Sequence, residues 1–216
     1  ECEQNFDQDP ELKVLILTGT GDRAFCTGMD LKAAAARIAE GGPVSNVVPP
    51  YMKTDKITIA AVNGYAVAGG LERSLACDIR IASEDAIFGL PEVLVGLPSV
   101  IEASLLPKTI GLGRARRLIM TGDSVTSQEA LEMGLVDQVV AKDAVHDAAM
   151  ETTEKFRNIS PKVMAAQKDI IVKWLEMGDE QAAEYSIKAF ALGFTTGHPQ
   201  EAMTAFLEKR EPRFKS

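Results

Sequence analysis

The chain has 216 residues, a formal net charge of −8 and 46% hydrophobic residues. This length is enough for a domain with its own core. The acidic balance argues against nucleic-acid binding, which depends on clustered Lys and Arg. No apolar run approaches the roughly 20 residues that a membrane helix needs, so we expect neither a nucleic-acid partner nor a membrane span.

The N-terminal third alternates helical and strand patterns. An acidic helical segment ends at Asp9-Pro10, and the run KVLILT at 13–18 predicts a buried strand closed by a glycine. An alanine-rich helix is predicted at 31–39. The stretch from Gly41 to Pro50 has the Gly and Pro content of a loop.

The rest of the chain changes from mixed to helical character. The predicted elements are strands at 57–62, 78–82 and 86–88, a helix at 127–133, a strand at 136–140, and helices at about 144–158, 161–177, 180–196 and 199–209. We therefore predict an α/β fold with two regions, a core at 1–142 and a helical region at 143–216.

Cysteine and histidine are too sparse for several common kinds of site. The three cysteines, Cys2, Cys26 and Cys77, are odd in number and far apart, which favours reduced thiols in an intracellular compartment. The two histidines, His146 and His198, are not spaced as ligands. We expect no metal site and no histidine-centred triad.

One turn has the spacing of a nucleotide-binding motif. Gly19, Gly21 and Ala24 follow a predicted strand and fit G-x-G-x-x-[GA]. A dinucleotide site needs a helix to begin at that turn, yet the helical pattern begins only near Asp30. The sequence disfavours this alternative.

Two glycine-containing loops could instead offer backbone N–H groups to a ligand. Gly69-Gly70 opens a short helical pattern, and Thr27-Gly28-Met29 follows a strand. Helix N-termini present unsatisfied N–H groups, and glycine lets a ligand oxygen approach. Each loop alone is also typical of an ordinary tight turn. Two N–H donors that converge on one oxygen would form an oxyanion hole.

Two glutamates near these loops have apolar neighbours in sequence. Glu72 lies among leucines, and Glu92 lies between the apolar runs 88–91 and 93–95. A surface salt bridge is the ordinary role of a glutamate, but a carboxyl in apolar surroundings is costly unless it is paired or functional. Two carboxyls in one pocket cannot both ionise easily, so they can act as an acid and a base.

Three segments resemble the enoyl-CoA hydratase/isomerase (crotonase) superfamily: AFCTGMDLK at 24–32, GYAVAGGLERSLACDIRIASEDAIFGLPEVLVGLP at 64–98 and HPQEAMTAFLEKREPRF at 198–214. The resemblance covers nearly the whole chain from Leu12. It implies a crotonase-like ββα spiral core, without the N-terminal part of the family fold, and a helical C-terminal trimerisation region. It also implies homotrimers or hexamers in the cytoplasm or in mitochondria.

The resemblance also implies roles for individual residues. Met29 and Gly69 would donate N–H groups to the thioester oxygen, while Glu72 and Glu92 would add water across an α,β double bond. The substrate-binding residues would be Thr27, Gly28, Asp30, Lys32, Gly70, Leu97, Ser99, Phe206 and Lys209. Among these, Lys32 would lie near the CoA phosphates, Thr27 would line the adenine pocket, and Phe206 and Lys209 would reach a neighbouring subunit's CoA. Coenzyme A would enter as part of an acyl-CoA substrate, with no permanently bound cofactor.

The chain departs from the family pattern at several positions. Ala68 replaces the first of three glycines, and Arg73 stands where the family favours an apolar residue. After Pro98, Ser-Val-Ile-Glu replaces a glycine-rich turn that lines the acyl site, and Glu102 adds a third carboxyl. These departures leave the substrate undetermined.

Retention of both glutamates favours a hydratase. A double-bond isomerase needs the same oxyanion hole and a single carboxylate base, and decarboxylation, dehalogenation and thioester hydrolysis are further reactions on this scaffold. A catalytically silent assembly or RNA-associated protein is the non-enzymatic alternative.

Overall fold

The structure is a computed structural model that describes residues 2–41 and 54–214. Its contacts divide the chain into two compact units that interleave along the sequence. The helical unit comprises residues 1–15, 54–57 and 151–216, and the sheet unit comprises residues 16–53 and 58–150. The predicted division at residue 142 stays a prediction, and the loop predicted from Gly41 to Pro50 lies, apart from Gly41, outside the described residues.

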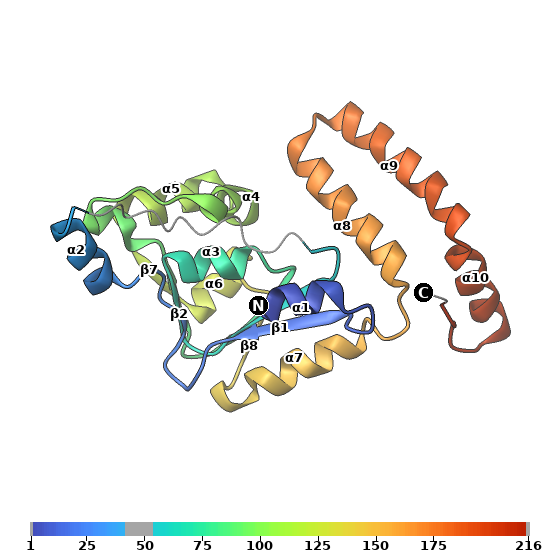
Figure 1. Ribbon diagram of the computed structural model, residues 1–216, viewed down its shortest axis with the longest axis horizontal. Helices are drawn as coiled ribbons and strands as arrows, with labels where there is room; N and C mark the ends of the chain where they lie inside the picture. The colour runs from blue at the N-terminus through green and yellow to red at the C-terminus, as the bar shows by residue number, and fades with distance from the viewer. Residues whose placement is uncertain (1, 42–53, 215–216) are drawn as a thin grey trace. The chain divides into compact units, whose positions relative to one another are not determined.

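The strands form two four-stranded sheets (Figure 1). One has the order β1 (Val14–Thr18), β3 (Ile57–Val62), β5 (Ile79–Ser83) and β8 (Gln138–Val140), and the other β2 (Ala24–Cys26), β4 (Tyr65–Val67), β6 (Ile87–Gly89) and β7 (Ser124–Thr126). β3, β5 and β8 run parallel, as do β2, β4 and β6, whereas β7 pairs antiparallel with β6. From β1 to β6, successive strands alternate between the sheets, which is the spiral that the resemblance implied.

Short helices follow the strands of the sheet unit. They are α2 (Leu31–Ala39), α3 (Gly69–Leu75), η1 (Pro91–Val95), η2 (Ile101–Leu105), α4 (Leu106–Ile110), α5 (Leu112–Thr121), α6 (Ser127–Met133) and η3 (Lys142–Ala144). Local capping explains where two of them begin. The side chain of Asp30 accepts from the first turn of α2, and Thr126 and Glu129 form a capping box at α6.

The C-terminal part is helical, as predicted. After α1 (Cys2–Gln8), the remaining helices are α7 (Val145–Glu154), α8 (Pro161–Glu176), α9 (Asp179–Gly193), η4 (Phe194–Thr196) and α10 (His198–Glu208). α8 and α9 pack as a hairpin (Figure 1). The predicted third helix ends at Gly193 rather than at Thr196, because the chain tightens there into η4. α8 has 16 residues, and no helix in the described part of the chain is both long and apolar enough to cross a membrane.

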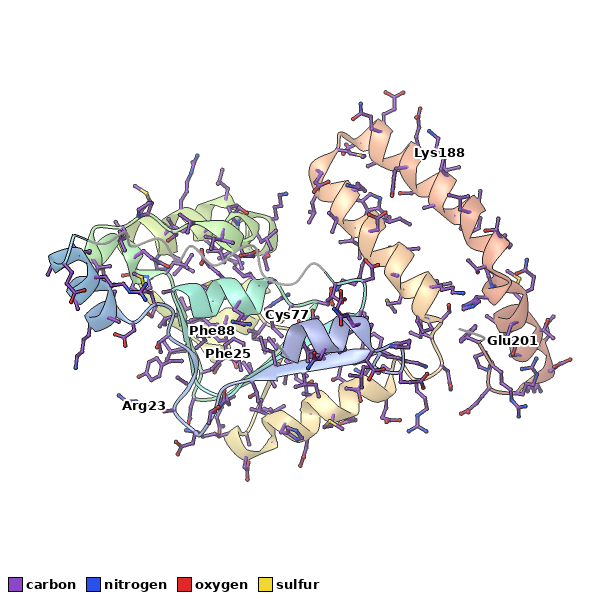
Figure 2. All side chains as sticks on the ribbon, viewed as in Figure 1. Arg23, Phe25, Cys77, Phe88, Lys188 and Glu201 are labelled. Atoms are coloured by element: carbon purple, nitrogen blue, oxygen red, sulfur yellow. The ribbon has the colours of Figure 1, made fainter. Side chains whose placement is uncertain are left out.

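A hydrophobic core fills the sheet unit. All six residues of β3 are buried, and Phe25 and Phe88, from β2 and β6, are buried beside it in the same cluster. Figure 2 shows both rings within this unit, whereas Lys188 points outward from α9. The strand expected before Thr27 is β2, whereas β4 and β7 were not predicted, because a run of three residues is short for a periodic pattern.

The CD-I motif at 77–79 has a structural role. The carboxylate of Asp78 accepts hydrogen bonds from the backbone N–H and the hydroxyl of Thr58, at 2.7 and 2.9 Å. Arg80, two residues on, donates to the carbonyls of Leu135 and Cys77, at 2.7 and 2.8 Å. These bonds tie the start of β5 to β3 and to the segment before β8.

Candidate active site

The two glycine loops predicted to converge do lie against each other. Gly28, directly after β2, has φ +78°, and a Cβ built on it would lie 3.0 Å from the backbone N of Gly69 and 2.9 Å from the Cβ of Ala68. A side chain at residue 28 would therefore crowd the N–H of Gly69, at the first turn of α3. The two loops therefore lie close together, and the convergence of the Met29 and Gly69 N–H groups on one oxygen stays a prediction.

A second glycine fixes the position of α3. A Cβ on Gly70 would lie 1.8 Å from the carbonyl oxygen of Cys26, the last residue of β2. Only glycine allows this contact, since real Cβ atoms do not approach backbone oxygen so closely. The start of α3 is thus held against the end of β2, and this contact brings the two loops together.

The residue before Gly69 has an unusual backbone. Ala68, the N-cap of α3, has φ 53° and ψ −131°, a conformation that L-residues other than glycine rarely adopt. Its N–H donates to the carbonyl of Gly89 in β6 at 2.9 Å. This turn directs the chain into α3, and glycine would adopt its backbone conformation without strain.

Glu72, in the first turn of α3, is the buried carboxyl of the site. Only 4% of it is exposed, and its Oε1 accepts from the N–H of Val100 at 3.2 Å. Burial, helped by the nearby charge of Glu92 and to a smaller extent of Glu102, raises the pKa of Glu72 to about 7, while hydrogen bonds from the amides of Ala103 and Val100 oppose the shift. The raised pKa favours the protonated form of Glu72 below neutral pH.

Glu92, in η1, is half-buried and lies within electrostatic range of Glu72. Its Oε2 accepts from the hydroxyl of Ser99 at 3.1 Å. The apolar surroundings predicted for Glu92 exist only on one side: Leu90 is buried, whereas Val93, Leu94 and Val95 are exposed. The η1 turn puts these three side chains at the surface, so Glu92 remains accessible beside the buried Glu72.

The other predicted site residues fall into three groups. Thr27, Met29, Lys32 and Leu97 are exposed, in the sheet unit. Asp30 caps α2, accepting from the N–H groups of Lys32 and Ala33 at 2.9 and 3.1 Å. Phe206 and Lys209 are exposed in the helical unit, and their contact with a neighbouring subunit's CoA stays a prediction.

Two backbone amides of the site were not predicted from the sequence. The amides of Val100 and Ala103 both stabilise the carboxylate of Glu72. Backbone amides leave no trace in residue type, so no sequence signal could have identified them. Glu102, noted only as an added carboxyl, is 8% exposed and adds to the negative potential at Glu72.

The disfavoured nucleotide motif has another role. The turn at Gly19 leads directly into β2 rather than into a helix. A Cβ on Gly19 would lie 1.9 Å from the carbonyl oxygen of Ala24. The glycine therefore serves a close backbone contact, and no helix N-terminus is available there for a pyrophosphate.

Comparison with known proteins agrees with this geometry. A family profile described as Enoyl-CoA hydratase/isomerase matches residues 2–216. The (E)-benzylidenesuccinyl-CoA hydratase of Thauera aromatica is 39% identical over 216 residues, covering 96% of this chain and 83% of the relative. The carnitinyl-CoA dehydratase of Citrobacter koseri is 38% identical over 221 residues, covering 98% of this chain and 84% of the relative.

Solved structures show the same likeness. An enoyl-CoA hydratase from Mycobacterium marinum superposes with a TM-score of 0.85 at 37% identity, covering 99% of this chain and 84% of that one. An enoyl-CoA hydratase from a Polaromonas species gives a TM-score of 0.91 at 25% identity, covering 99% and 86%. With converging glycine loops beside two carboxyls, this chain belongs to the enoyl-CoA hydratase/isomerase family.

Proposed function

We propose that the protein is an enoyl-CoA hydratase, a hydro-lyase that adds water across the α,β double bond of a 2-enoyl-CoA thioester. The observation that carries this proposal is the carboxyl pair: Glu72 is buried, and its pKa is raised to about 7 by burial and by the neighbouring Glu92. Water addition requires one group to take a proton and another to supply one. A buried carboxyl whose protonated form is favoured, beside a second and more accessible carboxyl, could provide both.

The backbone N–H groups of Gly69 and Met29 would polarise the thioester carbonyl. As water attacks the β-carbon, negative charge moves onto the thioester oxygen, and an oxyanion hole stabilises that enolate by a few kcal/mol. The close approach of Gly28 to the N of Gly69 supports this arrangement. A glycine at residue 28 leaves the space that the thioester oxygen would need.

The two carboxyls would complete the reaction without net consumption of protons. The ionised carboxyl takes one proton from water while the hydroxyl oxygen bonds to the β-carbon. The protonated carboxyl gives its proton to the α-carbon, so that the pair again holds one proton afterwards. Each half of this exchange is general acid–base catalysis.

A spectrophotometric assay tests the proposal. The purified protein is given a panel of short, branched and aromatic enoyl-CoAs, and hydration removes the absorbance of the conjugated thioester. We expect absorbance loss for at least one thioester, and a fall of two or more orders of magnitude in kcat for both Glu72→Gln and Glu92→Gln. No absorbance change with any member of the panel would contradict a hydratase.

Isomerisation of the double bond is the second candidate, because the family description covers both reactions. An isomerase moves one proton between two carbons, and a single carboxylate can carry it. In that case one of the two Gln variants loses activity and the other keeps most of it. A 3-enoyl-CoA substrate, followed by the appearance of conjugated absorbance, separates the two reactions.

The relatives suggest which thioesters belong in the panel. One is named as a hydratase of (E)-benzylidenesuccinyl-CoA, which should be tested by loss of absorbance, and another as a dehydratase of carnitinyl-CoA. Because a dehydratase removes water, carnitinyl-CoA should be tested by the appearance of conjugated absorbance. Coenzyme A would arrive with the substrate, and we propose no permanently bound cofactor. The location of the protein, cytoplasmic or mitochondrial, stays a prediction from the sequence.

We also propose a homotrimer or hexamer. The exposed apolar side chains of α9 and α10 support this assembly: Ile187 and Phe190 are each 69% exposed, and Phe206 and Leu207 are 82% and 79% exposed. Large apolar side chains that are this exposed on a single chain are often covered by another protein surface.

A further inference from the structure

One short segment contacts both carboxyls of the site. The hydroxyl of Ser99 donates to Oε2 of Glu92 at 3.1 Å, and the N–H of the next residue, Val100, donates to Oε1 of Glu72 at 3.2 Å. Two adjacent residues of the chain therefore hold the two groups that would exchange protons with the substrate. Any shift of this segment would move one carboxyl relative to the other.

A turn after η1 brings Ser99 close to Glu92. Gly96, the C-cap residue that follows η1, has a left-handed φ of 78°. This turn lets the N–H of Leu97 donate to the backbone carbonyl of Glu92 itself at 3.0 Å. A side chain at residue 96 would be strained in that conformation, so glycine is needed to bring the serine back.

The far end of the segment is anchored as well. Ile101 has φ 49°, a conformation that β-branched residues rarely adopt. The N–H of Ala103 donates to the carbonyl of Val100 at 3.0 Å, and Glu102 and Ala103 are 8% and 5% exposed. Backbone in such a region persists only when the surrounding structure holds it there, so the segment presents Ser99 rigidly.

We propose that Ser99 is a positioning residue, whose hydroxyl holds the carboxylate of Glu92 in place beside Glu72. This inference rests on the proposed hydratase function. The substrate contact predicted for Ser99 stays a prediction, because a hydroxyl that donates its one proton to Glu92 can still accept a hydrogen bond. Charge-assisted bonds of this kind are shorter and stronger than neutral ones, and they fix the orientation of a carboxylate.

Steady-state kinetics of three variants test the assignment. Ser99→Ala removes the donor, Ser99→Thr keeps a hydroxyl, and Ser104→Ala is the matched control, an exposed serine five residues further along the same segment. We expect kcat to fall about tenfold in Ser99→Ala, which corresponds to the loss of one hydrogen bond to a charged group. We expect KM to stay within about twofold, Ser99→Thr to recover most of kcat, and Ser104→Ala to match the wild type.

Other patterns would overturn the proposal. A raised KM at unchanged kcat in Ser99→Ala would show that the hydroxyl binds substrate instead. Equal losses in the Ala and Thr variants would show that the shape of the residue matters rather than its hydrogen bond.

A measurement that needs no substrate separates failure of the hydratase proposal from failure of the positioning role of Ser99. If the wild type hydrates no thioester, crystal structures of the wild type and of Ser99→Ala decide the positioning role. Displacement of the Glu92 carboxylate in the variant supports the role, and an unchanged carboxylate overturns it.

Discussion

Glu72 and Glu92 have the same side chain but different surroundings. Glu72 is on the buried side of α3, and Glu92 is half-exposed in η1 with a serine hydroxyl on its carboxylate. Burial disfavours the charged form of a carboxyl. Burial therefore favours the protonated form of Glu72. Ionisation of Glu72 should in turn lower the free energy of unfolding.

The pH dependence of stability checks this cost. The pKa of Glu72 is raised from 4.5 to about 7 in the folded protein, so the folded state binds a proton more tightly than the unfolded state. The free energy of unfolding should therefore fall as pH rises from about 4.5 to about 7. Above that range, the contribution of Glu72 should stay constant. Glu72→Gln removes the ionisable group, and should raise stability at pH 8 by about 2 kcal/mol relative to the wild type.

Thermal unfolding at pH 5 and pH 8 measures the effect. The stabilisation by Glu72→Gln should be clear at pH 8 and should shrink toward pH 5. Glu151→Gln on α7, an exposed position, serves as the control and should change little at either pH. A Glu72→Gln protein that gains equally at both pH values would contradict the raised pKa.

The backbone of Ala68 provides a second prediction at this scale. Its φ of 53° is strained for alanine but not for glycine. Ala68→Gly should raise the free energy of unfolding by about 1 kcal/mol in urea denaturation. Ala66→Gly, two residues earlier in β4, should instead lower it by about 1–2 kcal/mol, since glycine weakens a strand and the buried methyl group of Ala66 is lost. Destabilisation of similar size in both variants would argue against strain at Ala68.

At the level of elements, the site depends on how α3 is seated. α3 has only seven residues and could not be stable alone. It is held because its first turn packs against the end of β2 and its buried side includes Leu71 and Leu75. The positions of the Gly69 N–H and of Glu72 both follow from this packing, because both belong to the same two turns.

Substitution of Gly70 tests the seating of α3. A Cβ there would lie 1.8 Å from the carbonyl oxygen of Cys26, and the backbone has no flexible group that could move away. Gly70→Ala should therefore cost at least about 3 kcal/mol, the range of severe overpacking. Thermal unfolding is the measurement.

Gly113 offers a matched control. It lies inside α5, and a Cβ on it would meet no atom within 4 Å. Gly113→Ala should stabilise the protein by up to about 1 kcal/mol, because alanine has the better helix propensity. If Gly70→Ala were equally harmless, the close contact between α3 and β2 would be wrong.

At the level of the whole molecule, the net charge disfavours a nucleic-acid partner, whereas the exposed apolar side chains favour association with other copies of the chain. The net charge of −8 argues against binding to nucleic-acid phosphates. The apolar side chains of α9 and α10 remain exposed on the single chain. These helices would lose that exposure in an assembly of identical subunits, and assembly would then add to the stability of the helical unit.

Analytical ultracentrifugation tests the assembly. A single chain has a mass of 23.2 kDa, and we expect about three or six times that mass for the wild type. Ile187→Glu combined with Leu207→Glu should give monomers, since a charge in an apolar interface costs several kcal/mol. Ile187→Met keeps an apolar side chain and should preserve the wild-type mass, whereas a monomeric wild type would contradict the proposed assembly.

The sequence alone determined the α/β class, the main strands and the long C-terminal helices, because periodicity and capping residues such as Ser160 act locally. It also indicated the two glycine loops and the two glutamates. Only the tertiary structure decided that Gly28 meets Gly69, that Glu72 is buried while Glu92 is half-exposed, and that Ser99 and Val100 contact the two carboxyls. The physical reason is that burial, backbone amide direction and close approach arise from residues far apart in the chain, and no local pattern of residue types encodes them.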